Sequence, residues 1–426
     1  MAARFVQRLR TLSPAILLYL LAVALVGFAI DGGVYAVLLN LFLVRLDYGP
    51  ERIGLVNAAG MLTFAIASLP AGALGTRWGS RRIMMIGLAL MAGASAALPL
   101  ADALPSSWWL GWLVANIVVL YLGLALFFVN TAPFVMEAVH PSRRSEVFSL
   151  QSALLSLAAF AGSLLGGVLP PVFAAMSQTP LTDPAPYRYA LMVAAIGLGP
   201  AILLVRSASA GADPQPSEVE VAVRPADVLS PSYIGPRALL GVIVAIAVVR
   251  LLQVSGVGAT NTFFNVYLDS ELHVPTAQIG AIIAVARLLA VPAALATSPL
   301  TTRFGHRAVV IGASLSTTVA LLPIVLVPHW SAASLSFVGV VALSWIRYAA
   351  SMVFFLELVP PSRRALVSGV TEMAGGLTFT VLTFGGGYLI ALVGYRSLFL
   401  TGAGLTLLSA LVFWLAFRNA RPAPEG

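Results

Sequence analysis

The chain of 426 residues is 59% hydrophobic and only 9% charged, and its mean hydropathy is +0.96. Because ordinary soluble domains carry roughly 25% charged residues, this composition excludes a water-soluble globular protein. The formal net charge of +8 comes from arginines clustered between apolar runs, so we attribute it to membrane topology and expect no nucleic-acid partner. The chain has no cysteine, which excludes disulfides, thiolate metal sites and thiol nucleophiles.

Apolar runs long enough to cross a bilayer, about 20 residues each, recur along the whole chain. The first begins after Arg10 and continues past Asp31, which is too long for the apolar core of a cleaved signal peptide. The expected spans are 14–43, 50–75, 83–101, 107–136, 146–174 and 187–206, then 237–268, 276–298, 308–327, 331–357, 365–393 and 396–417. The sequence therefore predicts an all-α integral membrane protein with twelve transmembrane helices.

The twelve spans fall into two sets of six. Residues 207–235 between the sets are rich in Pro, Ala and Ser and hold no apolar run that could cross the membrane. We therefore expect an N-terminal six-helix bundle over 1–206, a cytoplasmic linker over 207–235 and a C-terminal six-helix bundle over 236–426.

Arginine counts give the expected orientation. Three of the 24 basic residues, all arginines, lie inside spans, and four lie on one side of the membrane: Arg45, Arg52, Arg188 and Arg396. The remaining 24 − 4 − 3 = 17 lie on the other side or in the termini and linker. By the positive-inside rule, both termini are expected in the cytoplasm and the protein in the cytoplasmic (inner) membrane.

Two loop motifs occur once in each half. Arg77, Gly79 and Arg81 recur with an offset of 303 − 77 = 226, and a Glu followed by an Arg pair recurs with an offset of 363 − 143 = 220. The paired segments hold Gly72, Arg77, Gly79, Arg81 and Arg82 against Arg303, Gly305 and Arg307, and Glu137, Arg143 and Arg144 against Glu357, Arg363 and Arg364. Duplication of a six-helix unit is typical of transporters in which two bundles rock about a site between them.

These features resemble the major facilitator superfamily over essentially the whole chain. The segment from Gly72 to Arg82 is similar to the signature Gly-x-Leu-x-Asp-Arg-x-Gly-x-Arg-Arg of the loop between spans 2 and 3, with Thr76 where the family usually has Asp. The resemblance implies two pseudo-symmetric six-helix bundles and secondary transport by alternating access. It also implies that the paired motif residues gate the cytoplasmic side, with Glu137 and Glu357 as acidic partners. Anchoring of the arginines at anionic lipid headgroups is the alternative.

Five charged residues lie inside predicted spans: Asp31, Arg250, Arg287, Arg347 and Glu372. An unpaired charge near the bilayer centre costs about 2.5–3.5 kcal/mol, so we expect these side chains to face partners or a hydrated cavity. None of the five is duplicated in the other half, which favours individual functions over a shared scaffold role.

We expect Arg250 and Arg287 to attract an anionic group of the substrate, with Gln253, Asn261 and Tyr35 beside them. Asp31 and Glu372 are the candidates for proton coupling, because a low-dielectric site favours the neutral form of a carboxyl. Arg347 either binds substrate or pairs with Glu372, which lies at a similar depth. Asn40 and Asn265 are related by the repeat, and we expect them to join helices or pack at a gate.

The function expected from these residues is proton-coupled transport of a small polar or anionic metabolite by a monomer, without cofactor or metal. The alternative is proton-driven export of amphipathic compounds, for which five aromatic residues would line the cavity: Phe127, Phe128, Phe263, Phe264 and Phe379. A polytopic membrane enzyme is a remote alternative, because the four His residues are scattered over loops on both sides and form no metal-binding motif.

Overall fold

The protein was analysed as a computed structural model that describes residues 13–140, 143–208, 236–359 and 364–418. Twelve helical segments in these residues are long and apolar enough to cross a membrane, and they match the predicted spans to within a few residues. The prediction of an all-α, multi-pass integral membrane protein is confirmed. The predicted linker lies almost wholly outside the described residues.

The first six spans consist of seven α-helices and a short 3-10 extension. They are α2 (Pro14–Ala29), α3 (Val34–Arg45), α4 (Pro50–Trp78), α5 (Ser80–Ala97) with η1 (Leu98–Ala103), α6 (Trp109–Ala138), α7 (Arg144–Ser177) and α8 (Ala185–Ser207). The last six are α9 (Pro236–Gln253), α10 (Ser255–Ser270), α11 (Thr276–Phe304), α12 (His306–Leu326), α13 (Trp330–Glu357), α14 (Arg364–Val393) and α15 (Tyr395–Phe417).

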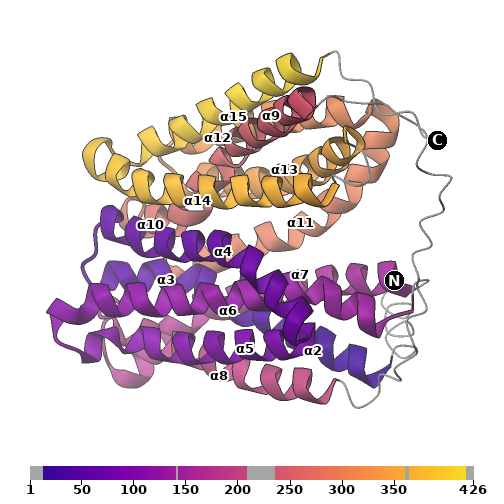
Figure 1. Ribbon diagram of the computed structural model, residues 1–426. Coiled ribbons are helices and arrows are strands. Elements are labelled where there is room, and N and C mark those ends of the chain that lie inside the picture. The colour runs from indigo at the N-terminus through magenta and orange to yellow at the C-terminus, as the bar shows by residue number, and fades with distance from the viewer. Residues whose placement is uncertain (1–12, 141–142, 209–235, 360–363, 419–426) are drawn as a thin grey trace.

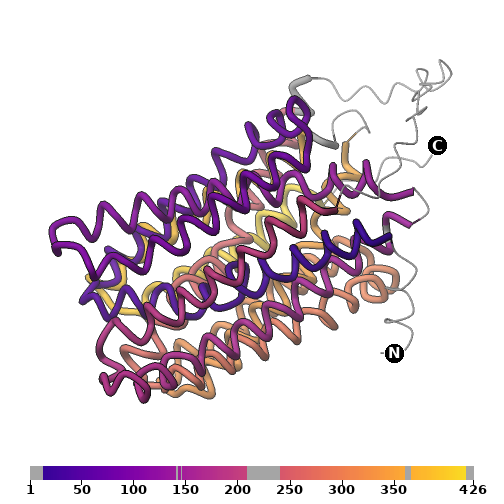
Figure 2. Tube along the Cα trace, turned by 90° about the horizontal axis from the view of Figure 1, so that it is seen from below, coloured from indigo at the N-terminus to yellow at the C-terminus, as the bar shows by residue number. Residues whose placement is uncertain are grey.

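The two sets of spans form two bundles that lie side by side (Figure 1). The bundles meet mainly along two helix pairs, α4 with α14 and α7 with α11. The helices run along one common direction, so the connections gather at two ends of the molecule (Figures 1 and 2). Because twelve crossings return the chain to its starting side, α2 begins and α15 ends at the same end. We call this the termini end, and the opposite one the far end.

The first and seventh spans are each broken near mid-membrane, where the sequence predicted continuous helices. The first is interrupted at residues 30–33 and the seventh at Val254. The offset that relates Asn40 to Asn265, 265 − 40 = 225, aligns Val254 with Ala29, the residue just before the first break. Gly32 has a φ of 84°, and a Cβ on Gly33 would lie 1.8 Å from the carbonyl oxygen of Phe28. Glycines are therefore required at the first break. Non-helical backbone at this depth is tolerated where protein or a hydrated cavity surrounds it.

A single glycine joins the helices at each copy of the loop motif. Gly79, between α4 and α5, has a φ of 88°, and Gly305, between α11 and α12, has a φ of 80°. Side chains rarely adopt this conformation, so both motif glycines are needed for the turn. Gly72 lies inside α4 and not in the loop, and the atom nearest to a Cβ placed there belongs to Val129, 3.6 Å away.

Candidate functional site

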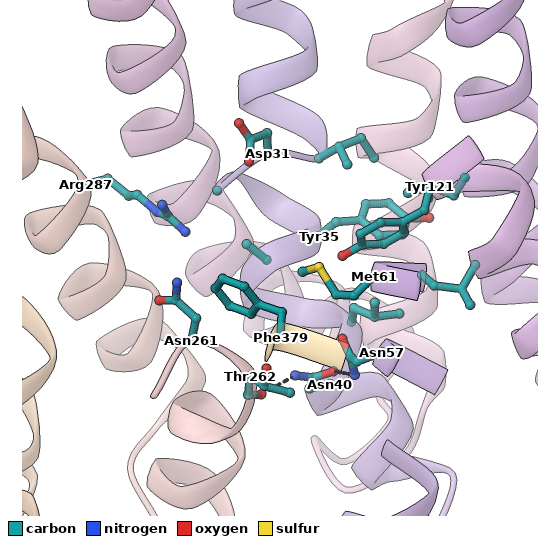
Figure 3. Close-up of a pocket in the computed structure, with 16 residues that line it drawn as sticks. Asp31, Tyr35, Asn40, Asn57, Met61, Tyr121, Asn261, Thr262, Arg287 and Phe379 are labelled. Atoms are coloured by element: carbon teal, nitrogen blue, oxygen red, sulfur yellow. Dashed lines mark hydrogen bonds between the residues drawn. The ribbon is translucent and has the colours of Figure 1, made fainter. Parts of the chain in front are cut away.

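A central pocket of about 280 Å³ lies between the two bundles (Figure 3). The N-terminal bundle contributes residues from the first-span break, α3, α4 and α6, and the C-terminal bundle contributes residues from α10, α11 and α14. Its charged and polar lining residues are Asp31, Tyr35, Asn40, Asn57, Tyr121, Asn261, Thr262 and Arg287. The pocket has the position that a transported solute would need, because both bundles reach it.

The two charged lining residues come from different bundles. Asp31 sits in the first-span break and its side chain is exposed to the pocket, whereas Arg287 reaches from α11 toward that break (Figure 3). The Arg287 guanidinium packs against Gly32, where a Cβ would lie 2.9 Å from Nε. Nε of Arg287 is buried without a hydrogen-bond partner, and the described residues show no ion pair within 4.0 Å between Arg287 and Asp31. The two opposite charges therefore share the pocket without neutralising each other by contact.

Amides supply most of the hydrogen-bonding capacity of the pocket. Asn57 donates to Oδ1 of Asn40 at 2.7 Å, and Asn40 in turn donates to the carbonyl oxygen of Thr262 at 2.6 Å. Oδ1 of Asn261 is buried without a partner, so it remains available as an acceptor. The hydroxyl of Tyr35 donates to the carbonyl oxygen of Ser95, so Tyr35 presents its ring to the pocket and not a free hydroxyl.

Of the five phenylalanines considered for drug export, Phe379 lines the pocket, together with the aromatic residues Tyr35 and Tyr121. Phe127, Phe263 and Phe264 are at most 1% exposed, and Phe128 packs edge-on against Phe127 at 5.5 Å. The described lining therefore combines charged and amide groups with aliphatic side chains and three aromatic rings.

Four of the predicted site residues lie outside this pocket, in the C-terminal bundle. Gln253 is fully buried and hydrogen-bonds Ser351 across α9 and α13, so it does not face the solute position. Arg250 lies with its guanidinium 4.9 Å from the centre of the Tyr348 ring. Glu372 accepts a hydrogen bond of 2.8 Å from the Tyr348 hydroxyl and forms no ion pair with Arg347 among the described residues. Arg250 and Gln253 therefore do not lie beside Arg287 as expected, and of the five intramembrane charges Asp31 and Arg287 line this pocket.

Reciprocal amide contacts hold the bundles together on the far-end side of the pocket. Asn40 of α3 donates to the carbonyl oxygen of Thr262 in α10, and Asn265 of α10 donates to the carbonyl oxygen of Val37 in α3 at 2.8 Å. The offset of 225 relates both donors (40 + 225 = 265) and both acceptors (37 + 225 = 262). The two contacts are therefore one contact made twice about a pseudo-twofold axis, as expected for helix-joining residues.

An ion pair that the sequence analysis missed lies nearer the far end. Both terminal nitrogens of Arg45 contact the carboxylate of Asp269, at 2.6 and 2.7 Å, and the two side chains are 16% and 10% exposed. Arg45 also donates to the hydroxyl of Tyr187, which is 3.0 Å from the Thr276 hydroxyl of the other bundle. These contacts close the far end of the interface in this conformation.

The loop-motif arginines cap helix ends within their own bundles. Arg81 donates to the carbonyl oxygens of Val205 and Arg206 at the end of α8, and the repeat-related Arg307 donates to that of Arg418 after α15. Arg144 likewise donates to Met136 and Val139 near the end of α6. A cation at a helix C-terminus is favoured by the helix dipole and satisfies carbonyls that lack partners. Of the other motif arginines, Arg77 and Arg82 are exposed, Arg303 lies over the Phe304 ring, and Arg143 pairs with Glu146.

The motif acids contact the first residues of the third and ninth spans. Ser80 donates to Glu137 at 3.2 Å, and the ring of His306 lies 3.9 Å from Glu357. Because 80 + 226 = 306, these contacts are also repeat-related. Arg363 and the side chain of Arg364 lie outside the described residues, so the predicted gating network stays a prediction.

Comparison with known proteins bears on the fold and on the class of function. The model of the Major Facilitator Superfamily matches residues 20–346 and 246–426. A stretch of 148 residues is 28% identical to an uncharacterized MFS-type transporter of Mycobacterium tuberculosis, Rv1250, and covers 34% of this chain and 24% of that protein. The chain thus spans about a quarter of the length of that relative.

Solved structures with this fold are transporters of several kinds. A bacterial homologue of the human lysosomal transporter Spinster, inward-facing and unoccupied, matches with a TM-score of 0.71 at 14% identity over 96% of this chain and 98% of its own. A D-xylose–proton symporter matches with a TM-score of 0.70 at 16% identity, over 94% of this chain and 97% of its own. The nucleoside transporter NupG, in a mutant form, matches with a TM-score of 0.69 at 14% identity over 95% and 99%.

The similarity to these structures shows the fold alone, whereas the family model covers nearly the whole chain. With twelve membrane-spanning helices in two bundles around a central pocket, the chain belongs to the Major Facilitator Superfamily.

Proposed function

We propose that this protein carries a small polar solute with an anionic group across the cytoplasmic membrane, together with a proton. The observation that carries this proposal is the central pocket, which a carboxylate of one bundle and a guanidinium of the other enter together. Three asparagines in the same lining suit hydroxyl or carbonyl groups of the solute.

Coupling follows from the charges. When Asp31 is ionised, its field partly compensates the charge of Arg287, and the pocket is neutral overall. When Asp31 takes up a proton, Arg287 is left uncompensated in a low-dielectric site and binds an anion more strongly. Proton and anion then favour each other's binding, which is the linkage that symport requires.

The direction of opening follows from the closed far end. The positive-inside rule places the Arg-rich termini end in the cytoplasm. The amide contacts and the Arg45–Asp269 pair close the opposite side, which supports an inward-facing assignment of this conformation. Alternating access requires these contacts to break and the termini end to close.

The volume and lining disfavour the alternative of drug export. A pocket of about 280 Å³ lies just below the range of roughly 300–1,000 Å³ for drug-sized ligands. Its charged and amide lining, which stands beside the three aromatic residues Tyr35, Tyr121 and Phe379, also suits a polar solute better than an amphipathic one.

The first test is ligand-induced stabilisation of the purified protein. We expect small carboxylates or phosphorylated sugars to raise the unfolding temperature more than neutral sugars and nucleosides do, and more at acidic pH than at alkaline pH. Arg287→Gln should weaken this binding about 10- to 100-fold, because a charged hydrogen bond contributes about 1.5–3 kcal/mol. Asp31→Asn should remove the pH dependence while keeping the binding.

Transport in proteoliposomes completes the test. Asp31→Asn is expected to exchange solute across the membrane but not to accumulate it in response to a proton gradient. Asn116→Ala serves as the control, since Asn116 bonds only within its own helix, to the carbonyl oxygen of Trp112. Stabilisation by neutral solutes alone, unaffected by Arg287→Gln, would contradict the proposal.

A further inference from the structure

A second group of charged side chains lies in the C-terminal bundle, where α9, α13 and α14 meet. It consists of Arg250, Arg347, Tyr348 and Glu372, and none of these residues lines the central pocket. Side chains of α9 and α13 meet at this depth: Gln253, three residues after Arg250, hydrogen-bonds Ser351, four residues after Arg347. The guanidinium of Arg250 also lies 4.9 Å from the ring centre of Tyr348, the residue that follows Arg347.

Both arginines are buried with unsatisfied donors. Arg347 is 2% exposed, and its Nε and Nη1 atoms are buried without hydrogen-bond partners. Arg250 is 9% exposed, and its Nε is also buried without a partner. Natural proteins rarely leave charged donors in this condition, so each unsatisfied atom requires an explanation.

The surrounding residues do not neutralise the group. Glu372 is the one carboxylate that the described residues place beside these arginines, and its Oε1 accepts its hydrogen bond from Tyr348. Two guanidiniums and one carboxylate leave an excess of 2 − 1 = +1. An uncompensated buried cation is strongly destabilising, whereas an anion between the arginines would satisfy both its charge and its donors.

We propose that Arg250 and Arg347 form an anion-binding site, separate from the central pocket, for a carboxylate or phosphate group. Guanidinium groups bind both oxyanions through paired hydrogen bonds, and both guanidiniums of this group have buried donors without partners. Gly375 faces Arg250 without a side chain, since a Cβ there would lie 3.7 Å from Nε and Nη2. Glu372 is exposed, so the group is reached from that side.

The site lies beside the interface between the two bundles. Gly376, one helical turn beyond Glu372, contacts Ala65 of α4 in the other bundle, so Glu372 lies on the α14 face that borders the interface. The site is therefore near the path between the bundles on the termini side of the pocket. It binds an anion whether or not Asp31 and Arg287 handle the transported solute, and so goes beyond the proposed function.

Thermal unfolding of the purified protein in three salts tests this site. Sodium chloride, sodium acetate and sodium phosphate are compared at one pH and matched ionic strength, for the wild type, Arg347→Met and Arg287→Met. Phosphate also stabilises proteins by exclusion from their surface, so the difference between wild type and Arg347→Met is the signal. The acetate and phosphate arms distinguish a carboxylate site from a phosphate site.

We expect acetate or phosphate to raise the unfolding temperature of the wild type by several degrees more than that of Arg347→Met. In chloride, Arg347→Met should unfold at or above the wild-type temperature, because it removes a buried unneutralised charge. Arg287→Met should keep the part of the response that Arg347→Met loses, whatever part the central pocket contributes.

Two results would overturn the site. One is an equal anion response in wild type and Arg347→Met, and the other is a response lost in Arg287→Met but kept in Arg347→Met, which assigns the binding to the central pocket. If Arg347→Met does not fold, Arg250→Met replaces it, with loss of the anion response supporting the site and full retention overturning it.

Discussion

Arg45 shows how much a single residue's role depends on its partner. Its sequence position, just after an apolar run on the side with few arginines, predicted only a place in a loop. In the structure it ends α3 and pairs through both terminal nitrogens with Asp269, which lies 224 positions away at the end of α10. No local pattern links these two residues, because the contact exists only when the two bundles close at the far end.

We predict that Asp269→Asn loosens this closure. Ala36→Cys places a single cysteine in the pocket, because the chain itself has no cysteine. The rate at which this cysteine is labelled reports how open the far end is. In membranes, a membrane-impermeant maleimide added at the far end should label this cysteine about tenfold faster in Asp269→Asn. That factor corresponds to a loss of about 1.4 kcal/mol from a partly buried ion pair.

Asp102→Asn is the matched control. It breaks the ion pair between Asp102 and Arg188, which lies at the same end but inside the N-terminal bundle. The side chain of Arg188 is 22% exposed and that of Asp102 is 10% exposed. Labelling should stay at the wild-type rate in this control. Equal labelling rates in Asp269→Asn and wild type would show that the ion pair does not hold the far end closed.

Among the helices, particular glycines allow the two bundles to approach closely. A Cβ on Gly387 of α14 would lie 2.4 Å from the carbonyl oxygen of Pro50, and one on Gly280 of α11 would lie 2.6 Å from Cα of Gly167. Both contacts join the bundles. Gly385, two residues before Gly387, has nothing within 4 Å of its Cβ position.

Gly387→Ala is therefore expected to push α14 away from α4 and destabilise the closed far end. A clash with backbone cannot be relieved by turning a side chain, so we expect a loss of about 1–3 kcal/mol and an unfolding temperature lower by several degrees. Gly385→Ala, in the same helix, should change it little or raise it, since alanine favours helix. Thermal unfolding of both variants checks this, and an equal effect of the two substitutions would contradict the assigned contact.

The break in the first span was not predicted. Its sequence, with one acid and two glycines between apolar runs, is compatible with a continuous amphipathic helix until the neighbouring helix is placed. Ser163 of α7 donates to the carbonyl oxygen of Gly32 at 2.6 Å, and Arg287 packs against the same glycine from the other bundle. These long-range contacts satisfy the freed backbone and make an irregular segment stable at mid-membrane.

At the scale of the whole molecule, pseudo-twofold symmetry organises the contacts between the bundles. Asn40 and Asn265 exchange equivalent bonds with the opposite helix, but only Asn40 also accepts from Asn57. The symmetric pair holds the bundles together at one end, and the asymmetric addition connects that contact with the central pocket.

We predict that Asn265→Ala shifts the population toward closure of the termini end, and that Asn40→Ala shifts it further. Each loses a buried amide-to-carbonyl bond that contributes about 1 kcal/mol, and Asn40→Ala also leaves Asn57 with one acceptor fewer. Spin labels on Thr76→Cys and Thr302→Cys, two exposed repeat-related positions at the termini end, report this shift. The distance between the two labels is measured by pulsed electron paramagnetic resonance. Shorter label separations are expected in both variants, and an unchanged distance distribution in both would rule out a role for the amides in closure.

From the sequence alone we predicted that the chain lies in a membrane, how many times it crosses, that its two halves repeat, and which family it resembles. These properties depend on composition and on short segments, because each span must be apolar along its own length and must satisfy its backbone internally. The repeated Gly79 and Gly305 turns could be predicted for the same reason, since they require only local backbone geometry. Asp31, Arg287 and Asn261, which the sequence singled out as site residues, line the central pocket.

Only the tertiary structure decided which intramembrane charges share a site. Depth along a helix was readable from residue counts, but the direction in which a side chain points depends on helix rotation and on the neighbouring bundle. Arg250, Arg347 and Glu372 therefore lie apart from Arg287, although the sequence suggested that Arg250 and Arg287 act at one site. Packing between helices far apart in sequence divides the charges into a neutral pair at the pocket and a cationic group beside it.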